Sequence, residues 1–180
     1  MKKINFSIIW WLVVISYISI IYATLGIAPK IWDLINDLLG GRGVMAQHFI
    51  YTITSSLIFL YLVYIKKENA LIKYFWFFIC IGLGFLIVKT TPFPAEKIHI
   101  AEYGILGVLL YNALKIHSDR FCWKLYVAGV LLCMAIGAVD EVIQFLLPNR
   151  VFDWRDIFLN GASGALTLFL IRFSILKERV

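Results

Sequence analysis

Two long stretches without a charged side chain constrain this sequence more than any other feature. Residues 4–29 form a run of 26 uncharged residues, and residues 43–65 form a run of 23. A helix needs roughly 20 apolar residues to cross the hydrocarbon core of a bilayer, where an open strand cannot satisfy its backbone hydrogen bonds. Both runs therefore predict membrane-spanning helices. The first is interpreted as a retained helix because it is too long for a signal peptide and lacks a clear cleavage site.

The composition agrees with a membrane protein and excludes a soluble domain. Hydrophobic residues make up 62% of the 180 residues and charged residues only 16%, whereas soluble domains carry about 25% charged residues. The net charge of +6 does not indicate nucleic-acid binding, because in a membrane protein the distribution of Lys and Arg between the loops matters more than their sum. We expect no nucleic-acid partner.

Further apolar segments complete the predicted architecture. We expect an all-α, polytopic bundle of about six transmembrane helices, at residues 8–28, 46–65, 72–90, 97–116, 124–147 and 156–174. Residues 1–70 would contain two of these helices and an outer amphipathic segment, and residues 71–180 would contain the others, within a single bundle. The amphipathic segment, residues 31–39, is predicted to be a short helix in the outer interface, with a solvated loop as the alternative.

The basic residues predict the orientation of the bundle. Eleven of the 17 Lys and Arg residues fall at the two termini and in the loops near residues 66–73 and 115–124, and the other six fall in the opposite loops. Since cytoplasmic loops carry the excess of Lys and Arg, both termini are predicted to be cytoplasmic. The protein would then be a multi-pass protein of the cell membrane.

Polar residues, most of them ionisable, enter the outer ends of the last three predicted helices. Glu102, the Asp140–Glu141 pair and Asn160 lie about 6–10 Å from those ends, at 1.5 Å of rise per residue. An ionisable residue at the bilayer centre costs about 2.5–3.5 kcal/mol on insertion scales, and less near the edge. Because three helices carry such groups at one depth, we expect an outward-facing polar pocket on the extracytoplasmic side.

Helical spacing indicates which of these side chains share a face. His99 lies three residues before Glu102 and four before Tyr103, and Glu141 lies three before Gln144. His99, Glu102 and Glu141 therefore offer a general acid and base set if the protein is an enzyme.

The turn before the last helix, and the start of that helix, add further polar residues. Asp153, Asp156 and Asn160 share a face by their spacing. Arg150 is the expected counter-ion of the acids, and its guanidinium suits a phosphate or carboxylate. The small residues 161–164 would let this helix approach its neighbours closely.

Both polar segments resemble the signatures of a known family, the VanZ-like membrane proteins. Residues 96–112, EKIHIAEYGILGVLLYN, are similar to its first signature, with Lys, His and then Tyr four positions later. Residues 140–164, DEVIQFLLPNRVFDWRDIFLNGASG, are similar to the second, with Glu-x-x-Gln, Pro-x-Arg, Asp-x-x-Asp, Asn and small residues. Residues 71–180 are therefore identified as a VanZ-like region. The resemblance implies roles for Lys97, His99, Tyr103, Glu141, Gln144, Arg150, Asp153, Asp156 and Asn160.

That family takes its name from a protein that gives low-level teicoplanin resistance, so the resemblance implies a role at the cell envelope linked to glycopeptide resistance. Two features depart from the family pattern. Asp140 adds a second acid beside Glu141, and the first two helices exceed the minimal pattern.

Three functions are compatible with these residues. In the first, the pocket binds or modulates the head group of a membrane lipid or a lipid-linked envelope precursor, with Arg150 and Lys97 contacting phosphate. In the second, the protein is an intramembrane hydrolase or transferase acting on such a substrate. The third, a transporter, is disfavoured because the polar groups form one outer layer rather than a path. The predicted ligand-binding residues are Lys97, Tyr103, Gln144, Arg150, Asp153, Asp156 and Asn160.

No cofactor is predicted from these motifs, although one His and several carboxylates are groups that a divalent metal accepts. Against the enzyme hypothesis, no Ser or Cys nucleophile stands beside His99, and no HExxH spacing is present.

Overall fold

The computed structural model confirms an all-helical membrane protein. It describes residues 2–94, 96–116, 123–148 and 150–176, with side chains described from residue 7 onward. Within these residues there are seven α-helices and no strand. The helices are α1 (Lys2–Thr24), α2 (Ala28–Leu38), α3 (Gly43–Leu60), α4 (Leu71–Thr90), α5 (Glu96–Lys115), α6 (Trp123–Leu146) and α7 (Trp154–Leu170). Five-residue π-helices, η1 (Tyr61–Ile65) and η2 (Ile171–Ile175), extend α3 and α7.

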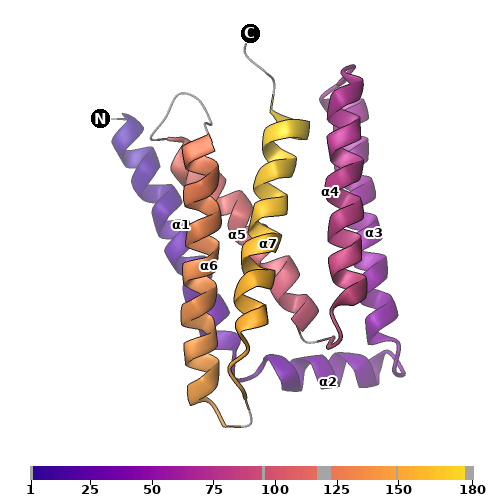
Figure 1. The fold of residues 1–180 in the computed structure, drawn as a ribbon, viewed down its shortest axis with the longest axis vertical. Coiled ribbons are helices and arrows are strands. Elements are labelled where there is room, and N and C mark those ends of the chain that lie inside the picture. Colours follow the sequence, from indigo (N-terminus) through magenta and orange to yellow (C-terminus); the bar gives the residue numbers. More distant parts are fainter. Residues whose placement is uncertain (1, 95, 117–122, 149, 177–180) are drawn as a thin grey trace.

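Five helices in the described part of the chain are long and apolar enough to cross a membrane. They cover Ser7–Thr24, Gly43–Ile65, Leu71–Thr90, Trp123–Leu146 and Trp154–Ile175. Helix α5 carries more charge, but it runs beside α1, α6 and α7 and packs against all three (Figure 1). The chain is therefore a multi-pass membrane protein, and α5 as a sixth membrane-crossing helix stays a prediction.

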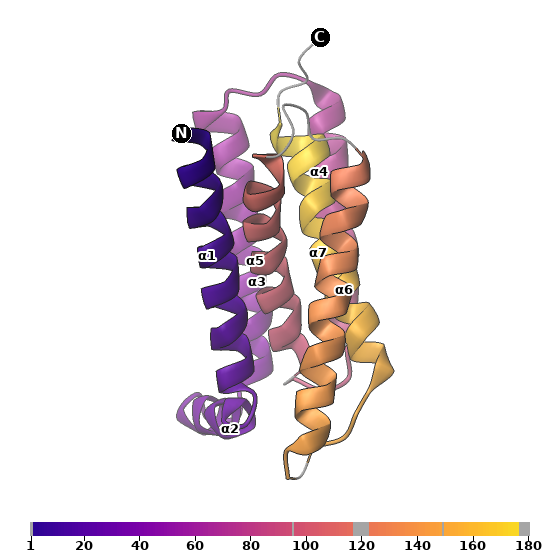
Figure 2. The ribbon, with the colours of Figure 1, turned by 90° about the vertical axis from the view of Figure 1, so that its left-hand side faces the viewer.

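Helices α1 and α3 are joined at one end of the bundle by α2, and this end is called the α2 end below. The start of α1 and the end of η2 both lie at the opposite end (Figures 1 and 2). The cytoplasmic location of the two termini stays a prediction. Residues 117–122 and 177–180, which contribute to the count of Lys and Arg on that side, lie outside the described residues.

Helix α2 lies across the bundle, roughly perpendicular to the other helices (Figure 1). Pro29 stands in its first turn, where a missing N–H costs nothing. Leu34 and Leu38 are 59% and 77% exposed. After the helix, Gly40 and Gly41 adopt positive φ angles of 60° and 78°, which glycine accepts readily. A short helix is therefore present where the sequence predicts one, so the alternative of a solvated loop is wrong, and its location in the outer interface stays a prediction.

The packed centre of the bundle is formed by α5, α6 and α7, the helices that carry most of the polar residues. Small residues allow their close approach. At Gly107 of α5, an added Cβ atom would lie 3.2 Å from the backbone oxygen of Gly164 in α7. Since backbone cannot move aside as a side chain can, this contact depends on glycine. Around it, Leu106, Leu110 and Cys133 are fully buried.

Candidate functional site

Asp140 lies at the centre of a buried polar cluster near the α2 end and is completely buried in α6. The Tyr103 hydroxyl, on α5, donates a hydrogen bond to Asp140 Oδ2 at 3.2 Å. Gln144 Nε2 lies 3.5 Å from Asp140 Oδ1, one turn along α6. Because Tyr103 is also completely buried, the two side chains form a polar link between α5 and α6 away from solvent.

Glu141 extends this cluster to the beginning of α7. Its Oε1 atom accepts a hydrogen bond from Gln144 Nε2 at 2.9 Å, and its Oε2 atom accepts one from the Asp153 backbone N–H at 2.8 Å. Glu141 is completely buried. Its side chain therefore ties α6 to the backbone 12 residues further along, across the turn that carries Arg150.

His99 stands between two carboxylates. Its Nδ1 atom lies 3.4 Å from Glu102 Oε2 and 3.6 Å from Asp140 Oδ2, with hydrogen-bond geometry to neither. The His99 side chain is 8% exposed, while the Glu102 side chain is 23% exposed. Helix α1 reaches the same place, because the Tyr17 hydroxyl donates to the Glu102 backbone oxygen at 3.2 Å.

Helix α7 contributes two more buried polar residues, Asp156 and Asn160. Asn160 is completely buried, and neither polar atom of its carboxamide has a hydrogen-bond partner in the described part of the chain. Gly137 of α6 makes room for it, since a Cβ atom there would lie 2.9 Å from Asn160 Nδ2. Ser163, by contrast, donates to the Leu159 oxygen of its own helix at 2.8 Å and needs no further partner.

The buried cluster thus consists of side chains from α5, α6 and α7, the segments in which the sequence shows its two polar signatures. A family model described as VanZ/LLP1 matches residues 10–176. The chain belongs to the VanZ/LLP1 family. The match includes the N-terminal helices as well as the region that carries the two signatures. No curated protein and no solved structure matches the chain significantly.

Partly exposed residues surround the cluster of this VanZ/LLP1 protein at the α2 end. Lys97, in the first turn of α5, and Arg150, in the turn before α7, are both half-buried. Neither forms an ion pair within the described residues, and Arg150 Nε is buried without a hydrogen-bond partner. The predicted pairing of Arg150 with the acids is therefore wrong for this structure.

Asp153 pairs with Arg155 instead. Its carboxylate caps α7 by accepting from the Arg155 backbone N–H at 2.9 Å, and it also accepts from Arg155 Nε at 2.8 Å. The Arg155 guanidinium holds the pKa of the Asp153 carboxyl below its usual range. A ligand role for Asp153 stays a prediction, because its side chain already has this partner.

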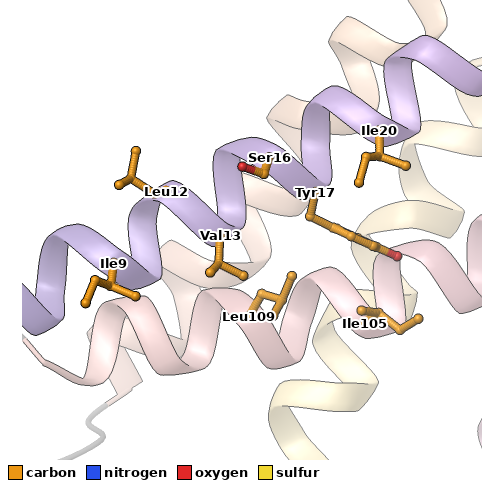
Figure 3. Close-up of a pocket in the computed structure, with 8 residues that line it drawn as sticks. All are labelled: Ile9, Leu12, Val13, Ser16, Tyr17, Ile20, Ile105 and Leu109. Carbon is orange, nitrogen blue, oxygen red and sulfur yellow. The ribbon is translucent and has the colours of Figure 1, made fainter.

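The cluster is closed rather than open. Asp140 and Glu141 are inaccessible, and the partly exposed residues at the rim of the cluster include Lys97, Glu102 and Arg150. An apolar groove, open to the surface of the bundle, lies between α1 and α5 (Figure 3). Among the described residues, no three His, Cys, Asp or Glu side chains are arranged to hold a metal ion, and the divalent metal stays a prediction from sequence.

Two contributors to the site of this VanZ/LLP1 protein are absent from the predicted catalytic and ligand-binding residues. Asp140 was expected in the polar layer and on the same face as Gln144, four residues later, but it was given no role of its own. Tyr17 lies in an apolar span that contains no other hint of a role, and its hydrogen bond to α5 depends on how the two helices pack.

Proposed function

We propose that this VanZ/LLP1 protein binds the phosphate-bearing head group of a membrane lipid, or of a lipid-linked envelope precursor, at the α2 end of the bundle. The observation that carries the proposal is Arg150, a half-buried cation that forms no ion pair within the described residues and whose buried Nε atom has no hydrogen-bond partner among them. Leaving a buried donor unpaired costs about 1–3 kcal/mol, and more when it is charged. A phosphate oxygen is the acceptor that a guanidinium fits best.

The surrounding structure supports a head-group site at this turn. The Arg150 backbone N–H donates to the Leu147 oxygen at 3.4 Å, and Glu141 holds the Asp153 N–H on the other side of the turn. These contacts hold Arg150 in place before a ligand arrives, which lowers the entropic cost of binding. Lys97 adds a second cation without an ion-pair partner within the described residues.

Substituting Arg150 with alanine tests this proposal. We expect the Kd for dioleoyl-phosphatidylglycerol to rise at least about tenfold, since a hydrogen bond to a charged group contributes about 1.5–3 kcal/mol. Binding would be measured by native mass spectrometry on delipidated protein. The matched control is Arg42→Ala, because Arg42 is an exposed arginine before α3 at the same end of the bundle. Equal lipid affinity in the two variants would refute the proposal.

Catalysis on the same class of ligand is the second candidate, favoured by the position of His99 between Glu102 and Asp140. An imidazole held between two carboxylates suits proton transfer. Envelope lipids and precursors would be compared by mass spectrometry in cells that express the wild type, His99→Gln or no protein. If the protein is an enzyme, we expect a covalently changed species in the wild-type cells alone. Identical covalent profiles in all three would rule out this candidate.

A further inference from the structure

We infer that one acyl chain of the bound lipid lies in the groove between α1 and α5, which makes the first helix part of the ligand site. The identity of the lipid rests on the proposed function, whereas the groove is a separate feature of the fold. Its lining is almost entirely apolar and includes Ile9, Val13 and Ile20 of α1, with Ile105 and Leu109 of α5 (Figure 3).

The dimensions of the groove fit a lipid chain. Ile9 and Ile20 are separated by about 16 Å along α1, at 1.5 Å of rise per residue. One leaflet of a bilayer accounts for about half of the 30 Å hydrocarbon core, or about 15 Å. The groove therefore runs along the bundle for about the depth of a single acyl chain.

The groove also approaches the polar cluster. Tyr17 lines it and points toward α5 (Figure 3), and its hydroxyl donates to the Glu102 backbone oxygen. The Glu102 carboxylate is partly exposed and lies 3.4 Å from His99. A chain in the groove would thus have its polar end beside the accessible edge of the cluster.

A second contact connects α1 to the turn that carries Arg150. A Cβ atom at Gly26, just after α1, would lie 3.9 Å from Leu147 Cδ1. The Leu147 backbone oxygen accepts the hydrogen bond of the Arg150 N–H. The end of α1 therefore lies beside this turn.

Annular lipid touches every exposed apolar face, so the inference concerns preference for the groove. Lipid tails are as apolar as leucine, and the preference must come from packing in a concave surface. We would reconstitute the full chain with phosphatidylglycerol that carries a diazirine in its acyl chain, then map the photo-crosslinks by peptide mass spectrometry. We expect about threefold more photo-crosslinks at the residues of the groove than at the exposed Phe78 and Leu86 of α4. A preference of this size is the scale expected from one side-chain contact within a membrane.

Filling the groove provides the matched test. Ile105→Trp places a large side chain in it, and we expect the enrichment to disappear. Val108→Trp makes the same change on the exposed face of α5, outside the groove lining, and should leave the enrichment intact. Both residues are exposed to lipid, so neither change enters the core.

The outcomes separate this inference from the proposed function. If the enrichment of crosslinks in the groove is lost in Arg150→Ala, the result supports both the groove and the head-group site. Enrichment that persists in Arg150→Ala, with unchanged lipid affinity, supports the groove and refutes the head-group site. Uniform crosslinking of wild-type protein, or equal effects of Ile105→Trp and Val108→Trp, overturns the groove inference, while the proposed function is then decided by the affinity of Arg150→Ala.

Discussion

Replacing Asp140 with alanine is expected to lower the free energy of unfolding by about 2 kcal/mol, because it leaves buried partners unpaired. The Tyr103 hydroxyl is completely buried and donates to Asp140 Oδ2. His99 Nδ1 would lose one of the two carboxylates that lie within 4 Å of it. Unfolding would be followed in mixed detergent micelles with a graded denaturant.

A double-mutant cycle separates the cost of an unpaired partner from the cost of the cavity. When both members of a buried polar pair become apolar, the loss is often small. Tyr103→Phe added to Asp140→Ala should therefore restore part of the stability, by about 0.6–1.7 kcal/mol as measured for hydrogen bonds within membranes. Asp33→Ala, at an exposed position of α2, is the control for charge alone. Strictly additive effects would contradict the assigned role of Asp140.

Substitution of Glu141 with alanine is the second large effect expected, at about 2 kcal/mol. The change removes the acceptor of the Asp153 backbone N–H and of the Gln144 side chain. Since Glu141 also holds the turn that carries Arg150, the Kd for phosphatidylglycerol should rise by about tenfold. Glu141→Gln retains one carbonyl oxygen at the same reach, which can accept from the Asp153 N–H but not also from Gln144, and should therefore lose less stability than Glu141→Ala.

Hydrogen exchange gives a local readout for this variant. The Asp153 amide should be protected in the wild type and in Glu141→Gln, and should exchange quickly in Glu141→Ala, because a hydrogen-bonded amide exchanges only when its bond opens. Equal protection of the Asp153 amide in all three proteins would show that the bond to Glu141 does not hold the turn.

Much of this fold follows from local sequence. The uncharged runs are long enough to span a bilayer, and a helix satisfies its own backbone, so the spans could be placed without knowledge of their neighbours. The same holds for α2, where Pro29 and the spacing of Leu34 and Leu38 indicate a short amphipathic helix. Family membership was also readable, because the two signatures lie within single continuous segments of the chain.

The arrangement of the site was decided by tertiary structure. Spacing along one helix assigns residues to a face, but the rotation of one helix against the next depends on contacts such as Gly107 against Gly164. That rotation puts Asp140 at the centre of the cluster and brings Tyr17 of α1 to α5. In the turn before α7, the backbone path brings Asp153 to Arg155 and leaves Arg150 without an ion pair among the described residues. Sequence spacing does not distinguish between these two arginines.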